Sequence, residues 1–429
     1  MRGVAATTPG TGSLTPLRVA GFKTLVAAYS INELGNWLGD IALAVLVYDK
    51  TGSALATALL FLATRFVPAA VAPALVARVD RLRPSRSLPL LYGLDAVVFA
   101  VLAVLAHGGF ALAPIVVLGA ADGSLALAAR ALTRSTSAAL LSPAGLLRRG
   151  NALFNFGFTA AGALGPAIAG LVVARAGPST ALVVDAGSFA LVAAMIAVAR
   201  TLPGAGRGDG GWRRRLGDAL AYVRERRLLA GLLGAQAIAS VFFYAVVPIE
   251  VIYAKKTLGA GVSGYGWLLA AWGAGMLAGG VLFAATPRAR IQVVLAAGTA
   301  AIGIAYFGLA AAPSLGIACA ISALGGVGNG VQWVSVVNAV QELTSASMQA
   351  RVLALLEGIG AALPAIGFFA GGAITAAASP RTAYLVAGAG VVVTLAVAAF
   401  ALRGARWPAR GGAAPEEPAA AVGRGPSAS

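Results

Sequence analysis

The sequence has few charged residues and almost no cysteine or histidine. Only 11% of its 429 residues are charged, and it contains one cysteine and one histidine. A soluble domain usually carries about 25% charged residues, so this chain cannot cover a water-facing surface. Cys319 has no partner for an intrachain disulfide, and His107 lies far from it in the chain. With no clustered nucleophile, base or metal-ligand set, we expect no enzyme, no metal site and no cofactor. The ATP-binding pattern Gly-x-x-x-x-Gly-Lys-Ser/Thr is also missing.

Long apolar segments dominate the sequence instead. Its residues are 59% hydrophobic, with a mean hydropathy of +0.86. The apolar residues come in blocks of about 20, the length that crosses a hydrocarbon core as a helix, and they lack the alternation of barrel strands. The first block is too long for a cleaved signal peptide. We predict an all-α membrane protein with twelve spans, at residues 22–48, 53–77, 88–107, 110–133, 151–175, 178–199, 229–253, 263–285, 290–311, 314–340, 352–378 and 381–402.

The basic residues are divided unequally between the two sets of alternate loops. The net charge of +17 could indicate a nucleic-acid partner, but the arginines lie between apolar blocks rather than on one soluble face. By the positive-inside rule the richer side is cytoplasmic, which places both termini inside a multi-pass protein of the cell inner membrane. The rich side holds Arg78, Arg81, Arg83, Arg86, Arg134, Arg148, Arg149, Arg288, Arg290 and Arg351, whereas the opposite loops hold only Lys50, Arg175, Lys255, Lys256 and Arg381.

Internal repetition predicts two similar halves. Three short matches share an offset close to 200 residues, among them Gly177–Ala181 with Ser379–Ala383. Two pseudo-symmetric six-helix bundles of like orientation follow. We expect a cytoplasmic segment at 1–21, a first bundle at 22–199, a cytoplasmic linker at 200–228, a second bundle at 229–403 and a disordered cytoplasmic tail at 404–429. The linker repeats Trp212, Leu216, Leu220 and Val223 at helical spacing, which fits either a helix on the membrane surface or one packed on the bundle.

Acidic side chains within spans are functional candidates, because an ionised group in lipid costs at least a few kcal/mol. Glu33, Asn36 and Asp40 share one face of the first span and are expected to line a cavity or meet another helix. Glu33 and Asp122 lie near mid-depth and are candidates for proton exchange or for buried structural pairing. Glu250, near the outer end of the seventh span, is a third candidate. Arg65 and Asp95 are expected to form an intramembrane ion pair, since their spans are neighbours in sequence.

Several segments resemble the major facilitator superfamily, especially its drug-exporter and enterobactin-exporter-like branches. The likeness extends over residues 22–402. It is carried by Ser30–Trp37, Val47–Ser53, Asp185–Phe189, Gly328–Gly330, and by Gln341 and Arg351. The resemblance implies the major facilitator fold, with two bundles that rock about a central cavity. In that family the Asp185 pattern implies a structural bond within the first half.

The loop between the second and third spans resembles the family pattern Gly-x-Leu-Ala-Asp-Arg-x-x-Arg. Arg78 and Arg81 match it and Arg83 follows, but proline replaces the glycine and Ala77 replaces the aspartate. In the family that aspartate latches the cytoplasmic gate. Asp80 is a candidate substitute. Two interpretations stay open for these arginines, a gate latch and positive-inside anchoring.

The fifth span resembles the family's antiporter motif, Gly-x-x-x-Gly-Pro-x-x-Gly-Gly. Gly165, Pro166 and Gly170 match, while Ala161 and Ala169 replace two glycines. Small residues at this spacing allow close helix packing, and the proline bends the span. The motif accompanies export in the family, whereas generic small-residue packing is the other interpretation.

Taken with the buried acids, the resemblance implies a monomeric secondary transporter. Its partners would be the lipid bilayer, protons and a small-molecule substrate, with no nucleic acid. We expect proton-coupled efflux of drug-like or secondary-metabolite molecules by alternating access. Two alternatives stay open, a proton-coupled importer and a membrane sensor that uses the same fold without transport.

Overall fold

The computed structural model describes residues 15–79, 83–198, 202, 212–286, 288–345 and 348–401. Within these ranges the chain forms helices and contains no strand. The predicted tail at 404–429 and most of the predicted N-terminal segment fall outside them.

The described part of the N-terminal half is built from five α-helices and two short 3-10 helices. After the short 3-10 helix η1 (Thr15–Arg18) come α1 (Phe22–Thr51), α2 (Ala54–Val79), α3 (Pro84–Gly108), α4 (Leu112–Leu141), the turn η2 (Ser142–Ala144) and α5 (Leu147–Val198). The long α5 is two spans, because Gly177 has a φ of 82° that breaks the helix immediately before Pro178. Only glycine adopts this conformation without strain. The break lies between the spans predicted at 151–175 and 178–199.

The C-terminal half follows the linker helix α6 (Trp212–Arg224). It consists of α7 (Arg227–Val246), η3 (Val247–Ile249), α8 (Glu250–Ile252), the π-helical turn η4 (Tyr253–Thr257), α9 (Gly261–Ala285), α10 (Ile291–Ala311), α11 (Leu315–Leu343), α12 (Gln349–Ala362), α13 (Pro364–Ala377) and α14 (Pro380–Ala401). The elements α7 to η4 form one interrupted span, and α12 and α13 form another, interrupted at Pro364. Proline has no amide hydrogen for the helix ladder, which accounts for the second interruption.

Ten helical segments of the described chain are long and apolar enough to cross a membrane. The segment containing α5 supplies two spans because of its break at Gly177. α1 is not among the ten, since Glu33, Asn36 and Asp40 lower its hydropathy. Counting both parts of α5 and adding α1 gives the twelve spans that the sequence predicts.

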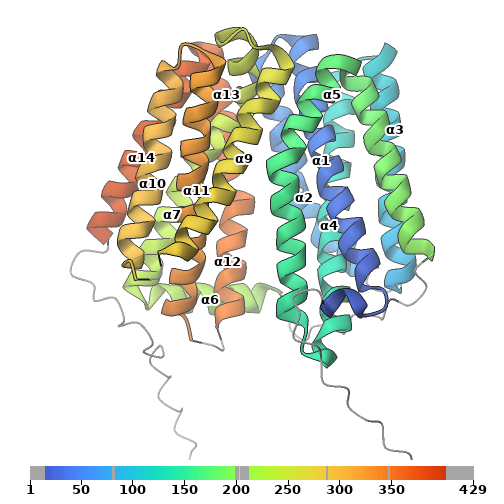
Figure 1. Cartoon of the computed structure of the whole chain (residues 1–429), viewed down its shortest axis with the longest axis horizontal. Helices are drawn as coiled ribbons and strands as arrows, with labels where there is room; N and C mark the ends of the chain where they lie inside the picture. Colours follow the sequence, from blue (N-terminus) through green and yellow to red (C-terminus); the bar gives the residue numbers. More distant parts are fainter. Residues whose placement is uncertain are drawn as a thin grey trace, which may run out of the picture.

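The two halves stand side by side as separate helical groups (Figure 1). α1 to α5 form one group and α7 to α14 the other, and α6 lies across the lower end of the C-terminal group (Figure 1). Within the N-terminal half, α1 packs on α5 and α2 packs on α4. Aromatic contacts strengthen each interior, such as the stacked rings of Phe99 and Phe189 and those of Trp272 and Tyr306.

The helix α6 uses one side to pack on the bundle. Ala219, Tyr222 and Val223 are buried, whereas Leu216 and Leu220 stay partly exposed. The Tyr222 hydroxyl accepts a 2.9 Å hydrogen bond from the Ser345 amide after α11. The Arg351 guanidinium on α12 donates a 3.0 Å bond to Asp218. The linker helix is therefore fastened to the C-terminal half.

Candidate functional site

Arg65 of α2 forms an ion pair with Asp40 of α1. Its Nη2 atom donates to Oδ2 of the Asp40 carboxylate. The predicted pair of Arg65 with Asp95 is wrong. Its premise was that spans adjacent in sequence are adjacent in space, but α2 packs on α4 whereas α3 packs on α5 and α4. Asp95 is fully buried, and neither of its carboxyl oxygens has a hydrogen-bond partner among the described residues.

Glu33 is held by an arginine that the sequence analysis did not select. The Arg130 Nη2 atom on α4 donates a 2.9 Å hydrogen bond to Oε1 of Glu33 on α1. The Glu33 side chain is only 6% exposed, so the arginine compensates a carboxylate that water barely reaches. An arginine eleven residues before the end of α4 was the available signal. The depth of Arg130 within the helix, rather than its place in a motif, would have identified it as a site residue.

Asp122 lies beside the Arg65–Asp40 ion pair and makes no hydrogen bond within the described residues. It lies on α4, within electrostatic range of both Asp40 and Arg65. Its Oδ1 atom is buried and has no hydrogen-bond partner in the described part of the chain. Asn36 lies between Glu33 and Asp40 on α1 and is half-buried. The structure therefore brings four of the five predicted cavity residues together in the N-terminal half.

Asp185 has a packing role. It is fully buried on α5, and its Oδ1 atom accepts a 3.1 Å bond from the Ser188 hydroxyl. Its carboxylate lies directly against Gly35 and Gly39 of α1, where any larger side chain would collide with it. The two glycines allow α1 to approach α5 closely.

Glu250 is separated from this group and lies in the C-terminal half. It begins α8, just after the turn η3 that contains Pro248. No cation forms an ion pair with it among the described residues. Instead it lies within electrostatic range of three buried tyrosines, Tyr265, Tyr306 and Tyr384. Glu33 and Asp40 of the first half are thus paired with arginines, whereas Glu250 of the second half lies among aromatic rings.

Arg65 also faces the C-terminal half. Tyr244 of α7 lies within its electrostatic range, and α2 packs along α13 through the rings of Phe61 and Phe368, whose centroids are 5.7 Å apart. Although Arg65 is near the middle of α2, 51% of its side-chain surface is accessible. A guanidinium at this depth needs water or a polar partner. Its contacts with both halves place that accessible surface at their boundary.

The antiporter-motif residues lie at a close contact between the halves. A Cβ added at Gly170 would lie 2.7 Å from the Cα of Gly266 on α9, and one added at Gly266 would lie 2.6 Å from the Pro166 carbonyl oxygen. Gly165 faces the other way, against the Trp37 side chain of α1. The motif positions therefore carry close contacts on both sides of α5.

A charged contact joins the halves at their arginine-poor end. Lys255 of η4 donates to the Asp49 carboxylate at the end of α1. The neighbouring Lys256 ammonium lies 5.5 Å from the centre of the Tyr48 ring. We call these four residues the outer clasp. On the opposite side, the predicted gate residues Asp80 and Arg81 lie outside the described residues, as does the Arg78 side chain. Arg83 is exposed and extended, directly before α3.

The arrangement has the form of a carrier. Within the described residues, no three His, Cys, Asp or Glu side chains come close enough to hold a metal ion. Two helical halves with paired and unpaired charges at their boundary define a multi-pass, all-α membrane fold.

Comparison with known proteins agrees with this class. The family model of transmembrane secretion effectors matches residues 11–412. The chain belongs to this family of the major facilitator superfamily. A search of curated proteins finds no match.

Solved structures share the fold at low sequence identity. The nucleoside transporter NupG is 14% identical, with a TM-score of 0.69 over 89% of this chain and 99% of that one. A bacterial homologue of the human lysosomal transporter Spinster, inward-facing and occupied, is 15% identical, with a TM-score of 0.68 over 92% and 98% of the chains. A POT family transporter in complex with a thioalcohol-conjugated peptide is 10% identical, with a TM-score of 0.69 over 91% and 99%.

Proposed function

We propose that this transporter exports amphipathic or weakly cationic small molecules, of the drug-like or secondary-metabolite kind, in exchange for protons. The observation that carries the proposal is the unbonded Asp122 carboxyl beside the Asp40–Arg65 pair at the boundary of the halves. In this reading the monomer lies in the cell membrane with its arginine-rich side and both termini in the cytoplasm.

Asp122 is the better proton carrier of the two acids that the sequence analysis places near mid-depth. Glu33 already accepts a hydrogen bond from Arg130. Asp122 has an arginine within range but no bond to it. When Asp122 carries a proton, Arg65 stays with Asp40. When Asp122 is ionised, it competes for Arg65 or for a cationic substrate, so that proton and substrate exclude one another.

Alternating access would follow from the contacts between the halves. The outer clasp and the Gly170–Gly266 contact hold the halves together toward the arginine-poor side. Opening that side requires both contacts to separate, while the other ends of the halves approach. The antiporter-motif positions favour export over import, since the family resemblance links them with efflux.

The test uses the purified full-length protein in proteoliposomes with an imposed pH gradient. A panel of amphipathic cations supplies the substrates. Asp122→Asn should abolish pH-driven flux and weaken the binding of cationic substrates, measured without a gradient, because the neutral amide resembles the protonated acid. Glu357→Gln is the matched control, because Glu357 is exposed on α12. Wild-type flux in Asp122→Asn would contradict the proton assignment.

The same preparation separates the alternatives. Accumulation of substrate along with inward proton flow would identify an importer. Binding without flux in any direction would identify a sensor.

A further inference from the structure

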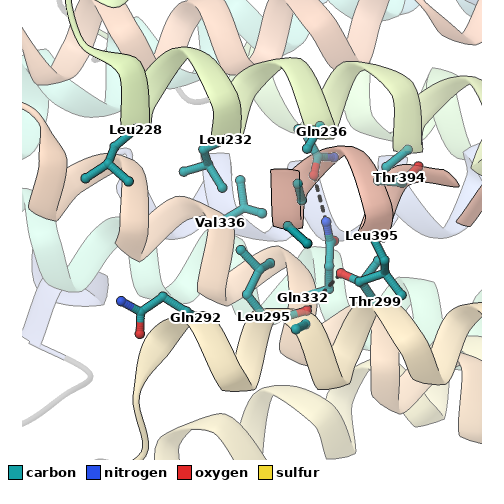
Figure 2. A pocket seen from close by; sticks show the side chains of 15 residues that line it. Leu228, Leu232, Gln236, Gln292, Leu295, Thr299, Gln332, Val336, Thr394 and Leu395 are labelled. Carbon is teal, nitrogen blue, oxygen red and sulfur yellow. Dashed lines mark hydrogen bonds between the residues drawn. The ribbon is translucent and has the colours of Figure 1, made fainter. Parts of the chain in front are cut away.

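The C-terminal half contains a cavity away from the charged boundary site. Its volume is about 330 Å³, and it lies between α7, α10, α11 and α14 (Figure 2). None of the acids or arginines described above lines it. Its lining is mostly leucine, alanine and valine, with a few amide and hydroxyl side chains.

Four of the five polar side chains in the wall take part in hydrogen bonds. The Gln332 Nε2 atom donates a 2.7 Å hydrogen bond to Oε1 of Gln236 across the cavity (Figure 2). The hydroxyls of Thr299 and Thr394 donate to carbonyl groups of their own helices, at 2.8 Å and 2.9 Å. These bonds reduce the demand for a polar ligand, so the remaining surface favours an apolar occupant.

The cavity extends sideways toward lipid. A shallow groove over α10 shares Gln292, Ala296 and Leu395 with the cavity and continues past Val293, which is 62% exposed. On a membrane-spanning helix an exposed valine faces hydrocarbon. A lipid chain can therefore enter the cavity from the side, past Ala296, Leu395 and the amide of Gln292.

The length of the cavity matches one leaflet. Along α7 its lining runs from Leu228, next to the helix start, to Ala239. Eleven helical positions span about 16 Å. Half of a bilayer's hydrocarbon core is roughly 15 Å thick. The cavity thus begins at the membrane surface on the arginine-rich side and ends near the bilayer centre.

Exposed arginines lie at the end of the cavity that faces the arginine-rich membrane surface. Arg227 directly precedes Leu228, and Arg290 precedes α10 two residues before Gln292. Both side chains are exposed, as is Arg288 in the same loop, and no ion pair involves them within the described residues. Guanidinium groups at this height bind lipid phosphate and favour anionic headgroups.

We propose that this cavity binds one acyl chain of an anionic phospholipid from the arginine-rich leaflet, with the headgroup held by Arg227 and Arg290. The second chain lies in the groove over α10. Bound there, the lipid fills the space between α7, α10 and α14 and acts as a structural ligand of the C-terminal half.

Native mass spectrometry of the purified full-length protein tests the proposal. The protein is titrated with phosphatidylglycerol or with phosphatidylcholine of identical chains. Wild type should retain one phosphatidylglycerol more tightly than phosphatidylcholine. Ala398→Phe on α14 and Ala296→Phe on α10, made separately, fill the cavity from two sides and should abolish this retained lipid. Ala100→Phe is the control, since Ala100 is exposed on α3 in the other half.

A second set of variants tests the binding of the lipid headgroup independently of the binding of the acyl chain. Arg227→Gln and Arg290→Gln should each weaken phosphatidylglycerol binding roughly fivefold and leave phosphatidylcholine unchanged. Arg175→Gln, at an exposed arginine on the opposite side, should change neither. The proposal is overturned if both cavity-filling variants, intact by size-exclusion chromatography, retain the lipid. It is also overturned if the two headgroups bind wild type equally, or if an amphipathic cation displaces the lipid from the cavity and binds there in its place.

Discussion

Arg130 and Glu33 are 97 positions apart in the chain, yet their side chains are joined by a 2.9 Å hydrogen bond between α4 and α1. The carboxylate is nearly inaccessible to water, whereas the arginine is 35% exposed. Because the two members are desolvated to different degrees, removal of the arginine should harm the protein more than removal of the acid.

We therefore expect Arg130→Met to lower the free energy of unfolding by about 3 kcal/mol, since it leaves a buried carboxylate uncompensated. Glu33→Gln should cost less, because the half-exposed arginine can turn toward water. The double variant should recover most of the loss. Thermal unfolding in detergent measures all three, with Arg175→Met as an exposed control. A double variant as unstable as Arg130→Met would contradict the pairing.

Double-mutant cycles can test whether Asp40 or Asp95 is the partner of Arg65. The cycle of Arg65→Gln with Asp40→Asn should give a coupling energy of about 1 kcal/mol, since half of the arginine is accessible and its pair is partly screened. The cycle of Arg65→Gln with Asp95→Asn should give a coupling near zero. Equal couplings in the two cycles would mean that Arg65 is shared between the acids.

The close approach of α5 and α9 predicts that one added methyl group separates the halves. Gly170→Ala places a Cβ against the Gly266 backbone, and such overpacking costs about 1–3 kcal/mol. Gly187→Ala is the control, because no atom lies within 4 Å of a Cβ at that glycine, in the second span of α5. Spin-label distances between the halves should lengthen at the outer end only in Gly170→Ala. Unchanged distances would contradict the close contact.

The outer clasp predicts a rescue by charge exchange. Asp49→Lys should destabilise the outer-closed arrangement by about 1 kcal/mol, an increase of roughly fivefold in the outward-open population. Lys255→Asp should do the same, and the two together should restore closure. Spin labels on the outer ends of the halves measure the populations after Cys319→Ser removes the native cysteine. Failure of the double exchange to restore closure would assign the effect to Lys256 and Tyr48 instead.

Sequence alone was sufficient for the architecture but insufficient for the pairing of its charges. Apolar length and the arginine bias of alternate loops are local properties, so they predicted twelve spans and the acids within them, and even the break at Gly177 was visible as Gly-Pro. The order in which helices surround one another is a property of the whole bundle. α2 packs on α4 rather than on α3, and this alone redirected Arg65 from Asp95 to Asp40. It also placed Arg130 against Glu33 and left Asp122 without a bond. Hydropathy is encoded residue by residue, whereas the partner of a buried charge is decided only when distant helices pack together.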